Sequence, residues 1–284
     1  MKGEKQVQSL FFGAAVLSAI VTLSIFVFMV VLGFPHVQSE SFFKLLVSPW
    51  SPDQGLYGIF PMIVGTTYIA ALSTLFAFFL SFGSASFISV LGPEKPANVM
   101  MGVVQFMTGI PTVVYGFVGV FLLVPIVREL FESGSGMCIL SASAVLALLV
   151  SPTMILIFCD HFSSVPRKYI NAVDALGGTP VQKLLYVILP SSFRGMVTGL
   201  ILAFGRAMGD TLVALMIAGN AVAVPDSVLD SARTLTAHIA LVIAADFESL
   251  EFKTLFICGI VLYGFTALCI IVIRLLTQSN GRQR

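Results

Sequence analysis

An arginine and an aspartate stand four residues apart inside an otherwise apolar stretch, residues 195–225. On a continuous helix, Arg206 and Asp210 would lie on the same face. A guanidinium stays charged at any physiological pH, and its fork of donors matches the oxygens of a phosphate-like anion. The pair could neutralise itself and hold helices together. Alternatively, Arg206 could meet a passing anion, with Asp210 occupying Arg206 between passages and keeping the binding weak enough for release.

Hydroxyl side chains could supply further donors along the same path, and five are candidates: Thr66, Thr67, Thr108, Thr112 and Ser151. Most Ser and Thr residues in membrane helices bond their own backbone, so only some of the five are expected to contact an anion. Thr66 and Thr112 are our main candidates. Pro111 and Pro152 are expected to interrupt their helices, and broken helices often mark translocation paths. Two pairs of glycines spaced by four, 195/199 and 205/209, predict close helix packing.

The composition of the 284-residue chain is that of a membrane protein. Hydrophobic residues make up 57% and charged residues 10%, with a mean hydropathy of +1.01. This composition excludes a soluble enzyme or a disordered chain, and the net charge of +1 excludes a nucleic-acid binder. A helix needs about 20 apolar residues to cross the hydrocarbon core. We therefore predict an all-α integral membrane protein with six spans, near 10–33, 58–91, 98–126, 138–159, 192–219 and 252–276.

The distribution of lysine and arginine predicts the orientation. With the N-terminus inside, ten lie on the cytoplasmic side and four outside, so both termini are expected in the cytoplasm. Segments 34–57 and 220–251 would then be external. Within the second, 234–245 is too short to cross and could form a surface or re-entrant helix.

The longest cytoplasmic segment, 160–190, has the pattern of two short amphipathic helices. Ser164 is a candidate cap, with Pro166 in the first turn. Ile170, Val173 and Leu176 share one helical face, and Gly177-Gly178 is a stop signal. Thr179-Pro180 predicts a second start, with an end near Leu189-Pro190. Such helices could dock in the groove of a partner or pack on their own protein.

This loop resembles the EAA loop of ABC importer permeases. The stretch 171–179 followed by Ile188-Leu189-Pro190 matches the family pattern, with Asn171 in the place of its glutamate and Gly177 in the place of its glycine. The resemblance implies that the loop binds an ABC ATPase dimer. The positions it assigns to this coupling are Asn171, Ala172, Asp174, Ala175, Gly177, Leu189 and Pro190.

Three further motifs resemble the phosphate-specific ABC permeases of the PstC branch. They lie at 57–66, 109–116 and 205–211, and Asp210 replaces the usual glutamate of the last. Over about residues 10–276, the resemblance implies a type I (MetI-like) permease fold. It also implies a first helix with an external segment at 1–57 and a permease core at 58–284, and it favours anion contact as the role of Arg206.

The resemblance implies a multi-pass subunit of a phosphate importer in the bacterial cytoplasmic membrane. Its partners would be a PstA-like permease, the ATPase dimer, an external phosphate-binding protein docking on 34–57 and 220–251, and membrane lipid. The chain has no P-loop sequence and no metal-ligand spacing, so we expect no catalytic residue and no bound cofactor, with ATP used by the partner. An ABC permease for sulfate, molybdate or tungstate and an autonomous secondary transporter remain alternatives.

Overall fold

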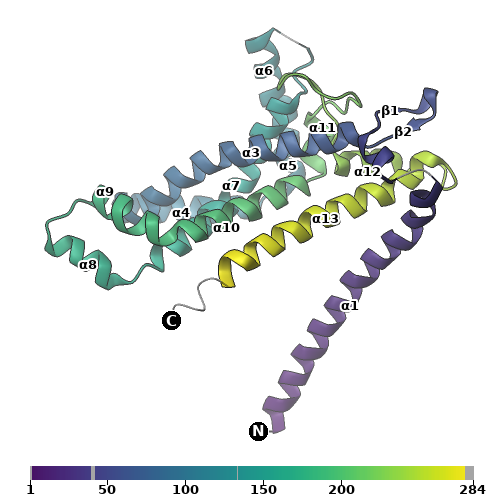
Figure 1. The fold of residues 1–284 in the computed structure, drawn as a ribbon. Coiled ribbons are helices and arrows are strands. Elements are labelled where there is room, and N and C mark those ends of the chain that lie inside the picture. The colour runs from purple at the N-terminus through teal and green to yellow at the C-terminus, as the bar shows by residue number, and fades with distance from the viewer. Residues whose placement is uncertain (1, 40–41, 133, 279–284) are drawn as a thin grey trace.

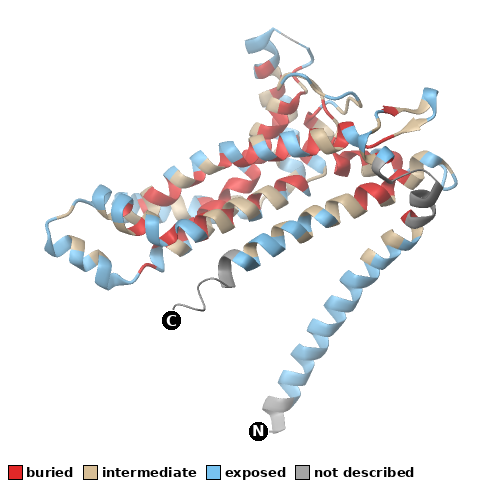
Figure 2. Cartoon of the chain, viewed as in Figure 1, coloured by how far each residue is buried: buried red, intermediate tan, exposed pale blue. Residues whose placement is uncertain are grey.

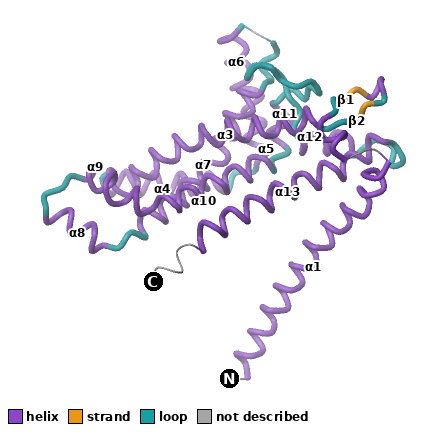
Figure 3. The backbone as a smooth tube through the Cα atoms, viewed as in Figure 1, coloured by secondary structure: helices purple, strands orange, loops and turns teal. Residues whose placement is uncertain are grey.

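The computed structural model describes the whole chain except residues 1, 40–41, 133 and 279–284, and the described residues are mostly helical (Figures 1 and 3). Six helical segments among them are long and apolar enough to cross a membrane, which confirms the predicted number of spans. They are Gln6–Gly33, Phe60–Leu91, Thr112–Phe131, Ile139–Ser163, Pro180–Met208 and Leu250–Leu275.

The centre of the bundle is formed by three helices, α3 (Phe60–Ser86), α7 (Ile139–Ser163) and α10 (Leu189–Met208). Phe158 and Met154 of α7 are fully buried in this core, and buried residues concentrate in the same helices in Figure 2. Hydroxyls join α3 to α7: the Oγ of Ser81 donates to the carbonyl of Ser151 at 3.2 Å. Small polar residues of this kind hold membrane helices together where no water competes.

The first helix, α1 (Lys2–Ser39), leans away from the bundle and meets α13 (Leu250–Gln278) near one end (Figure 1). Phe26 stacks on Tyr263 there, with ring centroids 4.4 Å apart. Most of the described α1 side chains are exposed and apolar. Since α1 has no polar face to turn to water, this surface suits lipid or a helix of another subunit.

The two segments that were predicted to be external pack together at one end of the bundle. The first contains α2 (Phe42–Val47), the short helix η1 (Pro52–Gln54), and a hairpin of β1 (Trp50–Ser51) and β2 (Leu56–Tyr57) with Trp50 opposite Tyr57. The second contains α12 (Leu235–Val242), an eight-residue helix that is too short to cross, as expected for this stretch. Trp50 contacts His238 of α12 edge-on, with ring centroids 4.5 Å apart.

The third predicted span, 98–126, is wrong as a continuous helix. The chain forms α4 (Glu94–Thr108), then breaks at 109–111, and continues as α5 (Thr112–Val118), the π-helical turn η3 (Gly119–Leu123) and α6 (Val124–Phe131). Pro111 has no N–H to donate and disfavours helical backbone at Ile110, so the helix stops before it. The membrane span is Thr112–Phe131.

Pro152, which was expected to interrupt its span, lies inside the uninterrupted helix α7. A proline at this position leaves the carbonyl of Leu148 without its helical N–H partner. The hydroxyl of Ser151 donates to that carbonyl at 3.1 Å. A neighbouring side chain therefore replaces the missing donor, and the helix continues.

The glycine pair 195/199 makes the predicted close contact between α10 and α7. A Cβ on Gly199 would lie 2.8 Å from the ring of Phe158, and one on Gly195 would overlap the imidazole of His161. A Cβ on Gly205, in contrast, would meet nothing within 4 Å. Only the first pair is thus a helix contact within this chain.

Replacing Gly195 with alanine should destabilise the subunit by about 1–3 kcal/mol, because the methyl group forces α10 away from His161. Gly205→Ala is the matched control, and should be neutral or stabilising by up to about 1 kcal/mol from helix propensity. Thermal unfolding of the purified subunit in detergent checks both. Equal melting temperatures for the two variants would contradict the packing argument.

Candidate functional site

The helix that carries Arg206 ends two residues later. Helix α10 stops at Met208, Gly209 to Thr211 form a break, and α11 (Leu212–Ile217) follows. The hydroxyl of Thr236 donates to the carbonyl of Asp210 at 2.7 Å, so α12 holds the break in place. The prediction of one continuous span to residue 219, with Arg206 near its middle, is therefore wrong. Arg206 occupies the last turn of α10.

This break separates Arg206 from Asp210. The Nη1 of Arg206 donates to the hydroxyl of Thr153 on α7 at 2.9 Å. The Oδ2 of Asp210 accepts the backbone N–H of Val213 at 2.9 Å, at the start of α11. The two side chains do not form an ion pair in this structure, contrary to the expected pairing. Because the helix ends at Met208, the four-residue spacing does not place them on one helical face.

The arrangement leaves Arg206 exposed on the side of the bundle, with a neutral hydroxyl as its hydrogen-bond partner. A charge near the membrane interior is costly, so it is expected to face a wet path or another subunit. Thr153 was not predicted from the sequence as the partner of Arg206. The one signal for it was its position next to Pro152. A guanidinium bonded to a hydroxyl is free to exchange that bond for an anion.

The two helix breaks belong to elements that lie against each other. A Cβ on Gly116 of α5 would come within 2.7 Å of the Sδ of Met216 on α11, so the two short helices touch. On the α5 side, the hydroxyl of Tyr115 donates to the carbonyl of Met107 across the break at 3.1 Å. Irregular backbone inside a membrane is tolerated where it is buried in protein or lines a cavity. Here the break before α5 and the break before α11 belong to two helices that contact each other.

Thr66 is held within the fold by its hydroxyl, and its assignment to the path stays a prediction. It is buried, its hydroxyl donates to the carbonyl of Met62 at 2.7 Å, and it accepts the N–H of Leu235 at 2.8 Å. Its donor is thus already used. Thr67, Thr108 and Ser151 likewise donate to carbonyls of their own helices. Thr112 is half-buried at the start of α5, and within the described chain its hydroxyl makes no hydrogen bond.

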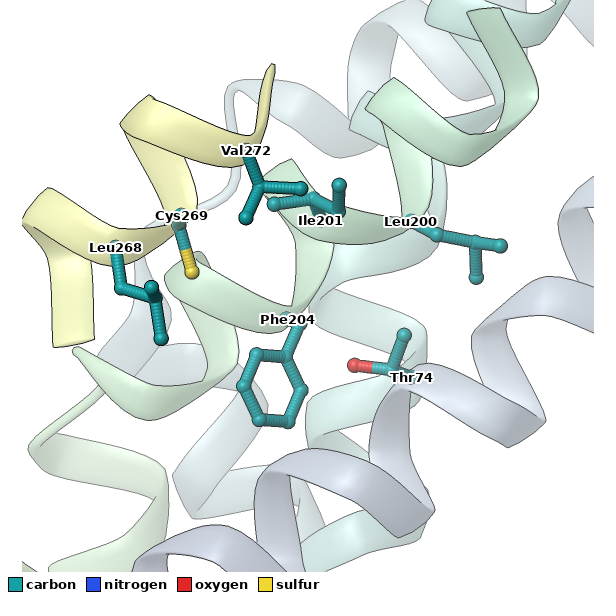
Figure 4. A pocket seen from close by; sticks show the side chains of 7 residues that line it. All are labelled: Thr74, Leu200, Ile201, Phe204, Leu268, Cys269 and Val272. Atoms are coloured by element: carbon teal, nitrogen blue, oxygen red, sulfur yellow. The ribbon is translucent and has the colours of Figure 1, made fainter. Parts of the chain in front are cut away.

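A cavity of about 290 Å³ lies between α3, α10 and α13, and Figure 4 shows the side chains that line it. One of its seven residues, Thr74, carries a hydroxyl, and that hydroxyl donates to the carbonyl of Ala70. The others are apolar or, in Cys269, a thiol. An anion needs donors to replace its water, so this cavity is no part of an anion path.

The loop at 160–190 contains the stop and the second start that the sequence predicts. Helix α8 (Arg167–Ala175) ends two residues before Gly177, which has a φ of +73°. The N–H groups of Gly177 and Gly178 donate to the carbonyls of Asp174 and Val173, which is a Schellman motif. Thr179 and Gln182 then cap α9 (Pro180–Lys183) reciprocally. The loop is therefore a defined hairpin of helices.

Two details of the loop prediction are wrong. Ser164 does not cap α8, because its hydroxyl donates back to the carbonyl of His161 at the end of α7. Nor does the second helix end at Leu189-Pro190, since α9 continues through the π-helical turn η4 (Leu184–Ile188) into α10. The π-turn widens the helix just before Pro190, where the missing N–H and the ring are accommodated without a break.

Most of the residues assigned to coupling lie on the surface. Asn171, Ala172, Ala175, Gly177 and Pro190 are exposed, and Leu189 is half-buried. Asp174 is also exposed and forms an ion pair with Lys183 across the glycine turn. At the surface such a pair contributes at most about 1 kcal/mol, so it aligns α8 and α9 rather than holding them together.

An apolar hollow of about 470 Å³ lies between the loop and the start of α10. It is lined by Tyr169, Ala172, Val173, Leu176, Tyr186, Val187 and Ser191. Leu176 is 87% exposed and Tyr186 is 75% exposed. Large apolar and aromatic side chains that stay exposed beside a hollow are typical of a protein-binding surface.

A buried histidine, His238, lies in α12, at the end of the bundle away from α8 and α9 (Figure 1). The hydroxyl of Thr254 donates to the carbonyl of Glu251, so the Nε2 of His238 must donate to Thr254, at 3.2 Å. The Nδ1 is then a bare acceptor, buried and without a partner. Burial and, to a lesser extent, the charge of Arg233 lower the pKa of His238 to about 4.

Stability should therefore fall in acid. Between pH 6.5 and pH 4 the unfolded chain binds a proton at this histidine while the folded chain does not, so the free energy of unfolding decreases by up to about 3 kcal/mol. The measurement is the melting temperature in detergent at pH 7.5 and pH 4.5, with His238→Phe, which cannot titrate, as the control. An equally large acid shift in both proteins would argue against His238.

The fold and the site define a class of protein: a helical membrane permease with an arginine at a helix break and an exposed loop of two short helices at one end. Residues 78–280 match the family described as binding-protein-dependent transport system inner membrane component. The chain belongs to this family of ABC importer permeases, as its loop predicted.

Curated relatives cover most of the chain. It is 34% identical to the probable ABC transporter permease protein YqgH of Bacillus subtilis, over 81% of this chain and 76% of that one. It is 30% identical to the probable phosphate transport system permease protein PstC of Methanocaldococcus jannaschii, over 68% and 69%. The identity to PstC of Haemophilus influenzae is 29%, over 98% and 94%. The resemblance to the PstC branch is confirmed.

Solved structures share the fold. The MetNI methionine ABC transporter in an inward-facing conformation aligns with a TM-score of 0.57 at 18% identity, over 75% of this chain and 93% of that one. A bacterial ABC transporter that imports the acidic polysaccharide alginate aligns with a TM-score of 0.56 at 12% identity, over 94% and 96%. The predicted type I, MetI-like fold is thereby confirmed.

Proposed function

We propose that this chain is a channel-forming subunit of an ATP-driven importer of inorganic phosphate. The observation that carries the proposal is Arg206, an exposed guanidinium beside a helix break whose resting partner is the hydroxyl of Thr153. The PstC relatives are described as phosphate transport permeases, and one aligns with 98% of the chain. Arg206 offers its fork to two phosphate oxygens, and no carboxylate has to be displaced first.

The importer would contain a second, PstA-like permease and an ATPase dimer as separate subunits in the bacterial cytoplasmic membrane. The chain has no P-loop sequence, so ATP would bind to the ATPase, which docks on the exposed loop of α8 and α9. An external phosphate-binding protein would dock where the hairpin of β1 and β2 and the helix α12 lie. Both termini would be cytoplasmic, as the lysine and arginine distribution predicts.

In the transport cycle, closure of the ATPase dimer on ATP would draw the loops of the two permeases together. The spans would rock to open outward, and phosphate would leave its binding protein and pass Arg206. Thr112 would offer a further hydroxyl donor at the α5 break. Asp210 would limit how tightly phosphate binds, because its carboxylate stands just beyond the break from Arg206.

The test is uptake of labelled phosphate into vesicles that contain this chain, the second permease, the ATPase and the binding protein. We expect uptake that requires ATP and persists in excess sulfate, molybdate or tungstate. If excess sulfate, molybdate or tungstate abolished the uptake of labelled phosphate, that oxyanion would be identified as the substrate. Uptake without ATP would instead support a secondary transporter and overturn the proposal.

A further inference from the structure

A second arginine is held at the external end of the bundle. Arg233 is half-buried, between Ala232, which bridges to Gly219, and Thr234, which caps α12. Its Nε donates to the carbonyl of Asn220 at 3.0 Å, just after the end of α11. Within the described chain its guanidinium has no carboxylate partner, and its two terminal amino groups make no hydrogen bond. Burial without compensation lowers the pKa of Arg233.

Asn220 presents a bare acceptor beside this cation. It adopts a φ of +59°, and its Nδ2 donates to the carbonyl of Leu215 at 2.7 Å, at the end of α11. This bond fixes the amide orientation and leaves the Oδ1, which is buried, without a donor. An unpaired buried acceptor is costly, but this one is out of reach of a ligand from solvent. The groups left for a ligand are the terminal amino groups of Arg233, which require acceptors.

The position of Arg233 relative to Arg206 is fixed by several contacts. The carbonyl of Arg233 packs so closely on Gly65 of α3 that a Cβ there would lie 2.6 Å away. The neighbouring Thr236 bonds the carbonyl of Asp210 at the α10–α11 break. Helix α11 has six residues, which span about 9 Å. Arg206 precedes this short helix, and Arg233 stands at its other end.

We propose that Arg233 and Asn220 form an outer contact site that receives the anion on the external side, before it reaches Arg206. The proposal rests on the proposed function and names a second binding site for the same substrate. The terminal amino groups of Arg233 donate to two phosphate oxygens. The backbone carbonyl of Asn220 accepts the Nε–H of Arg233 and so holds the guanidinium in place for this contact.

The experiment compares variants in proteoliposomes that contain the whole transporter, supplied with binding protein loaded with labelled phosphate. Arg233→Gln should lower the maximal uptake rate roughly 10-fold, the effect of losing a charge-assisted hydrogen bond. The concentration of loaded binding protein at half-maximal rate should not change. Asn220→Asp should cause a similar loss, because the new carboxylate neutralises Arg233. Arg128→Gln, at an exposed external arginine of α6, should change neither value.

Thermal unfolding of each variant separates this role from a structural one, and Arg233→Lys, which keeps the charge but loses the fork, should retain part of the rate. Unchanged uptake in Arg233→Gln would overturn the proposal. A higher half-maximal concentration at an unchanged maximal rate would also overturn it, because that result places Arg233 on the docking surface for the binding protein. Failure of the proposed function would appear separately, as wild-type vesicles that take up no phosphate.

Discussion

Replacing Arg206 with glutamine is expected to reduce ATP-driven phosphate uptake by about 100-fold while the subunit still inserts into the membrane. Hydrogen bonds to a charged group contribute about 1.5–3 kcal/mol, which corresponds to roughly 10- to 150-fold in rate or affinity. The side chain is exposed in this chain, so its loss should not disturb the core. Uptake of labelled phosphate into vesicles measures the effect, with the amount of inserted subunit measured in the same preparation.

Two companion variants show whether the charge itself is needed. Arg206→Lys keeps the charge but loses the bidentate fork, and should fall between wild type and glutamine. Thr153→Val removes the resting partner and leaves the guanidinium intact, so it should retain uptake within about 3-fold. Normal uptake by the glutamine variant would refute a role in transport. A strong loss in Thr153→Val alone would assign the bond between α7 and α10 a structural role.

Replacing Leu176 with glutamate should uncouple the subunit from the ATPase. Leu176 is 87% exposed beside the apolar hollow of the loop, at the end of α8. Central anchors of an interface contribute about 2 kcal/mol or more, so affinity for the ATPase should fall at least about 30-fold. A buried carboxylate without a partner would add to this loss. Co-purification of the ATPase and ATP-driven uptake are the two measurements, and both should fall together.

Leu130→Glu is the matched control, because Leu130 is 71% exposed in α6, at the opposite end of the bundle from α8. It should leave ATPase binding unchanged. If Leu176→Glu retained the ATPase at wild-type level, the exposed face of α8 would not be the docking surface. The melting temperature of the isolated subunit should be the same in both variants, since neither leucine packs in the core.

The spans and the loop caps could be predicted because their determinants are local. Charge-free stretches report membrane helices directly, and the glycines at 177–178 and Thr179 specify a stop and a start through their own backbone chemistry. The amphipathic pattern predicted an apolar face over Ile170, Val173 and Leu176, and left open whether this face packs on the protein itself or on a partner. These features depend on residues that lie within a few positions of each other, so the sequence alone is enough to predict them.

The site could be predicted only in part, because distant residues decide it. The hydroxyl of Thr66 accepts the N–H of Leu235, far along the chain, which ties it into the fold. Likewise, Thr236 holds the break that separates Arg206 from Asp210. Spacing along the sequence contains none of these contacts.

The helical stretch from Pro180 to Met208 has a mechanical consequence. Its 29 residues form one rod of about 40 Å, rooted by a capping box in the loop and carrying Arg206 at its far end. A tilt of about 5° at the root moves the far end of a rod of this length by about 3 Å. Such a tilt would carry the guanidinium of Arg206 away from Thr153 without any side-chain rearrangement. In the proposed importer, the ATPase on the loop would in this way set the position of the Arg206 charge at the other end of the rod.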